Sequence, residues 1–310
     1  MGNTISSSTP APLPTNTIAT SYNRKGNYTV QSTLGTGSHG IVYRVAHPKT
    51  PRPLAMKVLQ TSTSAQLRKF RQEATILATL SHPNIVDLED IGGVACPESG
   101  GWNACIVMQL ADYNLLDFHT ACSALGCISG LDEAIAQTLA FQMLSALTYL
   151  HERKLAHRNV KPANILVFHD SKSPPRLTFK LSDFGLAAQF LDDESVPTPV
   201  ARYTAPEILF CGGDAEQVCK ADVWALGMVC RDLCSRALTP PHTEGKMMGS
   251  WAKEATDWMT RESVWDRPTA KECKESVWVR QGERISPGIL RVLRKELGLH
   301  SAGTSDEMEM

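Results

Sequence analysis

Long apolar runs are missing from this sequence. No stretch reaches the roughly 18 to 20 consecutive apolar residues of a membrane-spanning helix. The start also lacks the basic-then-apolar order of a secretory signal peptide. We therefore expect a cytoplasmic protein with no membrane-spanning helix.

Paired cysteine motifs are missing as well. The 9 cysteines are an odd number, none stands in a CxxC pair, and no set of Cys and His has zinc-binding spacing. Disulfides or metal ligands are one interpretation, and buried free thiols are the other. The scattered positions favour buried thiols in a reducing compartment.

An excess of charge of one sign is also absent. The chain has 31 Lys and Arg against 32 Asp and Glu, and only 6% of its residues are aromatic. Basic patches with interleaved aromatics are typical of nucleic-acid binders, so we expect no nucleic-acid partner. The 310 residues do include 42% hydrophobic residues, enough for one large domain or two lobes.

Residues 1–27 are rich in Ser, Thr, Pro and Ala, and we expect them to form a disordered arm. The arm begins MGNTIS, which fits the N-myristoylation pattern M-G-x-x-x-[ST] at Gly2. A chance match is an equal alternative, because the pattern specifies few positions. A myristoyl chain on Gly2 alone gives weak membrane association, with an association constant on the order of 10⁴ M⁻¹.

After the arm, short β-type runs are followed by helical periodicity. This order predicts an α+β protein with two lobes. We expect a small antiparallel β-sheet lobe with one helix at 28–110, a larger helical lobe at 111–279, and a tail at 280–310 with a short basic helix around 289–297. The expected strands are Tyr28–Leu34, Ile41–His47, Leu54–Leu59, Ile85–Ile91 and Cys105–Leu110, and the main expected helices are Ser64–Leu80, Leu131–Arg153 and Lys220–Ser235.

A glycine-rich loop, GTGSHGIV, lies between the first two expected strands. Its glycines, Gly35, Gly37 and Gly40, allow a backbone to approach phosphates closely and to donate N–H groups to them. Alone the pattern also fits a dinucleotide-binding turn or a plain hairpin. The dinucleotide interpretation requires a helix directly after the loop, and here a strand follows.

Lys57, in the run Leu54-Ala55-Met56-Lys57, is expected on a central strand. A lysine there is costly to bury unless it is paired. Glu73 on the next helix is the best candidate partner. A solvent-exposed helix glutamate is the alternative, but the glycine loop and the lysine together favour pairing.

The later motifs resemble those of eukaryotic protein kinases. HRNVKPAN at 157–164 is similar to the catalytic loop, SDFG at 182–185 to the D-F-G segment, and APE at 205–207 to the A-P-E segment. DVW at 222–224 and RPT at 267–269 resemble the buried aspartate and late arginine segments, the latter pairing with Glu207. The resemblance covers Tyr28 to Val279 in the family's order. Lys161 follows the serine/threonine-kinase pattern.

The resemblance implies a role for each matched position and implies ATP and Mg²⁺ as cofactors. Adenine is expected against Leu34, Val42, Ala55 and Leu166, with the hinge at Gln109 to Ala111 and Met108 as gatekeeper. Lys57, held by Glu73, is expected on the phosphates under Gly35, Gly37 and Gly40, and Asn164 and Asp183 are expected to bind Mg²⁺.

The sequence departs from the family pattern at Asn159, where a kinase has its catalytic-base aspartate. Val200 stands where serine/threonine kinases have a threonine, although a shifted alignment is an alternative. The helical region between Asp222 and Arg267 is also shorter than usual. Arg158 is retained and could bind a phosphorylated Ser195 or Thr198, but these are equally well plain loop residues.

Three functions are compatible with these residues. The first is a pseudokinase, a scaffold or allosteric regulator in signalling that binds Mg·ATP and a protein partner. The second is a weakly or conventionally active serine/threonine kinase with protein substrates, in which Asn159 and Lys161 position the substrate. The third is a kinase-like fold that no longer binds nucleotide.

Overall fold

The computed structural model describes residues 13, 15, 17–21, 27–37, 40–59, 63–95, 102–124, 131–170, 176–189, 202–210, 215–235, 238 and 248–283. The chain divides into two compact units. The first comprises Met1–Ser81 and Val86–Ala111, and the second comprises His82–Ile85 and Asp112–Met310.

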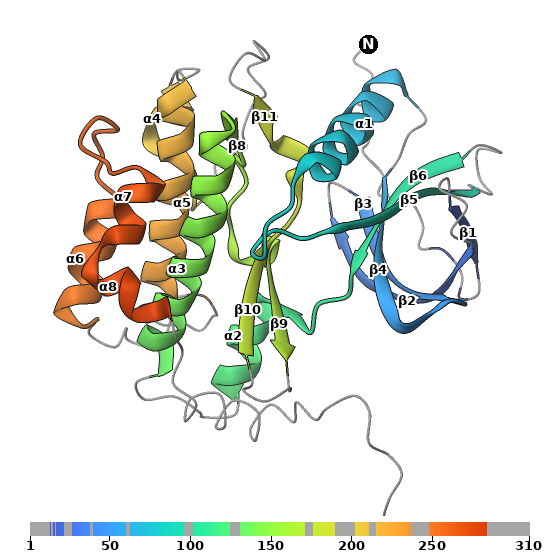
Figure 1. Cartoon of the computed structure of the whole chain (residues 1–310), viewed down its shortest axis with the longest axis horizontal. Coiled ribbons are helices and arrows are strands. Elements are labelled where there is room, and N and C mark those ends of the chain that lie inside the picture. The colour runs from blue at the N-terminus through green and yellow to red at the C-terminus, as the bar shows by residue number, and fades with distance from the viewer. Residues whose placement is uncertain are drawn as a thin grey trace, which may run out of the picture. The chain divides into compact units, whose positions relative to one another are not determined.

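The described residues of the first unit form an antiparallel sheet and one helix (Figure 1). Its strands close on themselves in the order β1-β2-β3-β4-β6-β5. Helix α1, Ser64–Thr79, contacts β5 and β6. The strands are β1 Ile18–Ser21, β2 Asn27–Gly37, β3 Gly40–His47, β4 Thr50–Leu59, β5 Leu88–Ala95 and β6 Trp102–Gln109.

Alternating side chains of these strands form the core of the first unit. In β3 the buried residues Ile41, Tyr43 and Val45 are separated by more exposed ones, as a half-buried strand requires. They pack with Met56 of β4 and Val107 of β6 in one hydrophobic cluster. The first three predicted strands are confirmed within the longer β2, β3 and β4.

Two predictions in this region were wrong. The arm at 1–27 was expected to lack regular structure, but Ile18–Ser21 forms β1, whose backbone pairs with β2 and β5. Such pairing depends on partner strands rather than on side-chain alternation. The strand expected at Ile85–Ile91 starts later, as β5 at Leu88, because Ile85 forms an isolated parallel bridge with Leu181.

The second unit is mainly helical (Figure 1). Its short strands form two small sheets, in the orders β10-β9-β7 and β11-β8. The elements are β7 Tyr113–Asn114, α2 Leu115–Ala124, α3 Leu131–Glu152, β8 Leu155–Ala156, η1 Pro162–Asn164, β9 Ile165–Asp170, β10 Arg176–Leu181, η2 Phe184–Leu186, β11 Ala188–Gln189, α4 Pro206–Phe210, α5 Ala215–Cys234, α6 Ser250–Met259, α7 Ala270–Glu275, α8 Val277–Arg280 and η3 Gln281–Glu283.

Helix α3 is the centre of this unit. It contacts α5, α7, α8 and η3, while α6 packs on α5 and α8. Ile135, Leu139, Met143 and Leu147 recur every four residues along α3 and are all buried, which is the spacing of one helix face. The predicted helix at Leu131–Arg153 is confirmed, and the one predicted from Lys220 begins earlier, at Ala215. The tail with its expected basic helix lies outside the described residues.

The described residues bear on two further expectations. None of the described helices combines the length and the apolar character that crossing a membrane requires. The cysteines within the described ranges, Cys105, Cys122, Cys219, Cys230, Cys234 and Cys273, are buried free thiols, as expected. Burial raises the pKa of the Cys105 thiol to about 12, so this thiol stays protonated and unreactive at neutral pH.

Candidate functional site

The predicted pair of Lys57 and Glu73 is present in the first unit. Nζ of Lys57 donates to Oε1 of Glu73 at 2.7 Å. The two side chains are only 9% and 2% exposed. Because an unpaired buried charge is costly, each side chain depends on the other. The pair gives the first unit a cationic group of fixed position.

Local structure explains how Glu73 reaches Lys57. Helix α1 begins with a capping box. The side chain of Thr63 accepts from the backbone N of Gln66, and the side chain of Gln66 accepts from the backbone N of Thr63. Phe70 and Glu73 lie three positions apart and are both buried. The helix therefore turns the same face, with the carboxylate on it, toward the sheet that carries Lys57.

The glycine loop joins β2 to β3, so a strand and not a helix follows it, as the sequence predicts. Gly40 has φ of +126°, and a Cβ there would lie 2.2 Å from the carbonyl oxygen of Val58. Only glycine fits this position. Gly35 and Gly37 have nothing within 4 Å of an added Cβ, so the fold itself leaves both glycines open to a ligand.

The residues expected around adenine are distributed over both units. In the first unit Leu34 is 48% exposed, whereas Ala55 and Met108 are buried and paired across β4 and β6. Val42 lies opposite Lys57 in β3 and β4. Gln109 ends β6, and Ala111 ends the first unit. In the second unit Leu166 lies in β9, opposite Asn114 and Lys180. Their contact with adenine stays a prediction.

Asp222 of α5 holds the start of the catalytic-loop segment in the second unit. Its carboxylate, 1% exposed, accepts from the backbone N of His157 and of Arg158, both at 2.8 Å. It also bonds Nε2 of His151 at 3.0 Å. Arg158 has φ of 64°, a left-handed conformation that is strained for a residue with a side chain. The buried carboxylate therefore stabilises a backbone shape that the loop would not adopt alone.

His157 is held as a neutral ring. Its Nε2 lies 3.0 Å from the carbonyl oxygen of Ser182, and its Nδ1 lies 3.3 Å from the backbone N of Asn159. A carbonyl only accepts and an N–H only donates, so Nε2 carries the proton and Nδ1 accepts. Complete burial lowers the pKa of His157, against the opposing effects of Asp222 and Asp183. The ring also packs edge-on against Phe184, with centroids 4.8 Å apart.

Asn159, Asn164 and Asp183 form one hydrogen-bonded group. Nδ2 of Asn159 donates to Oδ2 of Asp183 at 3.0 Å. Nδ2 of Asn164 donates to the backbone oxygen of Asn159 at 2.9 Å. The structure thus brings together three of the predicted site residues. Lys161 lies next to them in sequence, at the start of η1.

The chemistry of this group fits Mg²⁺. Asn164 uses its amide nitrogen for Asn159, which leaves its amide oxygen as a donor atom of the kind Mg²⁺ prefers. Asp183 supplies a carboxylate. Among the described residues no cluster of three or more His, Cys, Asp or Glu has metal-binding geometry, so a cation here would rely on these two residues together with water or substrate phosphates.

The late arginine motif pairs as the resemblance implies. Arg267, 1% exposed, donates Nη1 and Nη2 to the two carboxylate oxygens of Glu207, at 2.5 and 3.0 Å. Its guanidinium also lies over the ring of Trp224, 4.9 Å from the centroid. This two-bond pairing ties α4 to the segment after α6.

Comparison with known proteins decides the family. Residues 28–279 match the family "Protein kinase domain". The chain belongs to the protein kinase family. It is 32% identical over 219 residues to the ovarian-specific serine/threonine-protein kinase Lok of Drosophila melanogaster, covering 65% of this chain and 42% of Lok.

Other relatives are serine/threonine kinases too. Identity is 33% over 218 residues to serine/threonine-protein kinase 10-A of Xenopus laevis, covering 68% of this chain and 21% of that protein. It is 31% over 218 residues to human serine/threonine-protein kinase 10, covering 68% and 20%. The chain therefore spans less than half the length of each of these relatives.

The sequence did not point to an anchor near the A-P-E segment of this kinase domain. Asp232 of α5 is buried and accepts from Arg202 at 2.5 Å and from the Tyr203 hydroxyl at 3.1 Å. An acidic residue in the mostly apolar second half of α5 was the available signal. Val200 and the candidate phosphorylation sites Ser195 and Thr198 lie outside the described residues.

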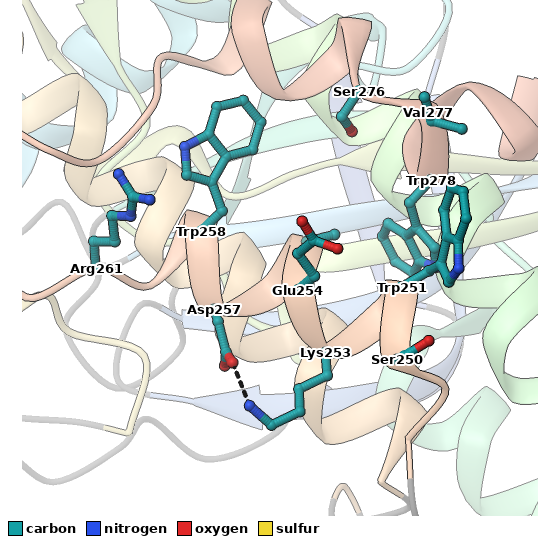
Figure 2. A pocket seen from close by; sticks show the side chains of 11 residues that line it. Ser250, Trp251, Lys253, Glu254, Asp257, Trp258, Arg261, Ser276, Val277 and Trp278 are labelled. Carbon is teal, nitrogen blue, oxygen red and sulfur yellow. Dashed lines mark hydrogen bonds and ion pairs between the residues drawn. The ribbon is translucent and has the colours of Figure 1, made fainter.

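A groove in the second unit lies apart from the predicted site residues. It has a volume of about 900 Å³ and is lined by α6 and α8 (Figure 2). Trp251 and Val277, 58% and 60% exposed, belong to its rim, and Lys253 bonds Asp257 along α6. None of the residues expected to bind nucleotide lines it. The groove is therefore separate from the expected nucleotide-binding residues.

Proposed function

We propose that this kinase-family protein binds Mg·ATP but transfers phosphate poorly or not at all, and that it serves as a pseudokinase scaffold or allosteric regulator for another protein. The observation that carries the proposal is the contact of Asn159 with Asp183. The side chain at the base position is a neutral amide, and its nitrogen donates to the neighbouring carboxylate at 3.0 Å.

The chemical consequence follows from what an amide can do. A kinase uses a carboxylate at this position to orient the substrate hydroxyl and to accept its proton. The amide oxygen of Asn159 can accept a hydrogen bond but cannot take a proton near neutral pH. Loss of a general base typically costs roughly 10² to 10⁴ in rate. Positioning and charge stabilisation persist, so residual transfer is compatible with this proposal.

Support for nucleotide binding comes from the groups that are kept. Lys57 is paired with Glu73 at 2.7 Å, Gly35 and Gly37 are open, and Asn164 and Asp183 offer oxygen ligands. In the family these positions serve ATP and Mg²⁺. A chain that had lost nucleotide binding would have no evident use for a buried lysine held in place.

An active serine/threonine kinase is the second candidate. The relatives named above are serine/threonine kinases, and Lys161 is retained two positions beyond Asn159. In this alternative the lysine and the Asn159 oxygen position the substrate hydroxyl without a base.

Thermal unfolding of the full chain with Mg·ATP tests the proposal. We expect stabilisation that grows with ligand concentration, as for any ligand that binds the folded state. Lys57→Met should lose this response. Absence of stabilisation in the unsubstituted protein would refute nucleotide binding. Transfer of labelled phosphate to protein substrates at ordinary kinase rates, roughly 1 to 100 s⁻¹, would instead favour the active kinase.

A further inference from the structure

The feature that carries a further inference is the way Asp183 is held. Its backbone is left-handed, with φ of 65° and ψ of 73°, a conformation that is costly for most residues and that Asp adopts with the help of local hydrogen bonds. Its carboxylate accepts the amide of Asn159 at 3.0 Å. The backbone of Asn159 is in turn bonded by Asn164 and by His157. A hydrogen-bonded amide therefore orients the carboxylate from within the second unit.

The charge of this group differs from that of a group with two carboxylates. An aspartate at position 159 would place a second negative charge at hydrogen-bonding distance from Asp183. Two carboxylates so close need a shared proton or a cation. Asn159 needs neither, because its N–H donates directly to the oxygen. Both side chains are half-buried, so salt screens such a charge less than it would at the surface.

We propose that Asn159 is a positioning residue for Asp183 and that it lowers the divalent-cation requirement of ATP binding. The inference rests on the proposed function, since it presupposes that nucleotide binds. Anionic ATP meets one carboxylate here instead of two, and that carboxylate is already oriented. Removing divalent cations therefore lowers the affinity for ATP by a smaller factor with Asn159 than with a charged residue at position 159.

Calorimetric titration of the full chain tests this inference. Affinity for ATP is measured in Mg²⁺ and in EDTA, and the ratio of the two affinities is compared between variants. We expect the ratio to be about tenfold larger in Asn159→Asp than in the unsubstituted protein, within the usual range of coupling between two ligands. Asn159→Ala, which is neutral but has no donor, should weaken both affinities and leave the ratio near that of the unsubstituted protein.

The outcomes separate this inference from the proposed function. Equal ratios in the unsubstituted protein and in Asn159→Asp would overturn the cation effect while leaving nucleotide binding in place. If Asn159→Asp does not fold, Asn159→Glu supplies the charged side chain for the same comparison, and a ratio equal to that of the unsubstituted protein overturns the inference. No binding under either condition overturns the proposed function, and with it this inference.

Discussion

The two units hold their functional carboxylates by different means. In the first, Glu73 accepts from the charged Lys57 at 2.7 Å, and both side chains are buried. In the second, Asp183 accepts from the neutral Asn159 at 3.0 Å. An ion pair supplies a cation for phosphates. The amide of Asn159 can hold a hydrogen-bonding geometry but cannot act as a proton acceptor, so the proposed function separates nucleotide binding from phosphate transfer.

A carboxylate at position 159 should have the largest effect, because it would remove the difference in chemistry between the two units. We expect Asn159→Asp to raise phosphate transfer by up to roughly 10² to 10⁴, the usual contribution of a general base. Transfer of labelled phosphate to a general protein substrate measures it. Asn159→Ala is the matched control, because it removes the amide without supplying a base, and it should show no gain. An unchanged rate in Asn159→Asp would contradict the role given to Asn159 in the impaired transfer.

Removing the cation of the first unit should have the next largest effect. Lys57→Met leaves Glu73 buried without its partner, which typically costs about 3 to 5 kcal/mol of unfolding free energy. The double variant Lys57→Met with Glu73→Leu should recover most of that stability, because both charges are then gone. Neither variant should respond to Mg·ATP. Urea unfolding with and without nucleotide measures both effects, and a nucleotide response in the double variant would contradict the role given to Lys57.

The same comparison shows which parts of the site the sequence could predict. Lys57 with Glu73 was predictable because a buried charge is costly unless it is paired. Arg267 with Glu207 was predictable because both stand in motifs that resemble those of protein kinases. The hydrogen bond that Asn159 donates to Asp183 was not predictable. Residue type shows that an amide cannot be a base, but not which way its nitrogen points.

The fold, like the site, has elements that the sequence could predict and elements that it could not. The two-lobed α+β class and the long helices follow from periodicity, since a buried helix face recurs every three to four residues. The short strand β1 does not, because its four residues are too few to show an alternation and its backbone depends on β2 and β5. The start of β5 was also missed, because Ile85 bonds across to Leu181 instead.

Acid should weaken the second unit. Burial is the main cause that lowers the pKa of both His157 and His82 there. Each then binds fewer protons when folded than when unfolded, where its pKa is about 6.5. Unfolding free energy should therefore fall as pH drops below about 6.5, by at most about 1.4 kcal/mol per pH unit for each histidine.

Urea unfolding at several pH values measures this slope. His157→Gln is the test variant, because its amide can still donate to the carbonyl of Ser182 but does not titrate. Its slope should be shallower than that of the unsubstituted protein. An identical slope would show that His157 does not contribute.

The smallest expected effect compares two helix caps, one in each unit. Thr63 caps α1 with the neutral Gln66, and Thr269 caps α7 with Glu272. Substituting either threonine with alanine should cost about 1 kcal/mol at neutral pH. Hydrogen bonds from the backbone and hydroxyl of Thr269 lower the pKa of Glu272. The stabilisation by this carboxylate is therefore fully present above the pKa that it has in the unfolded chain, and it is lost as pH falls through its lower pKa in the folded state.

The two caps should therefore diverge in acid. The cost of Thr269→Ala should stay constant at neutral pH and shrink as pH falls below about 4.3, where the unfolded glutamate titrates, and on through the lower pKa of Glu272 in the folded state. The cost of Thr63→Ala should stay constant, because Gln66 carries no charge. Hydrogen exchange of α1 and α7 in both variants measures each helix separately. If the cost of Thr63→Ala shrinks as much as that of Thr269→Ala, acid acts on both helices alike. The charge of Glu272 would then not distinguish the two caps.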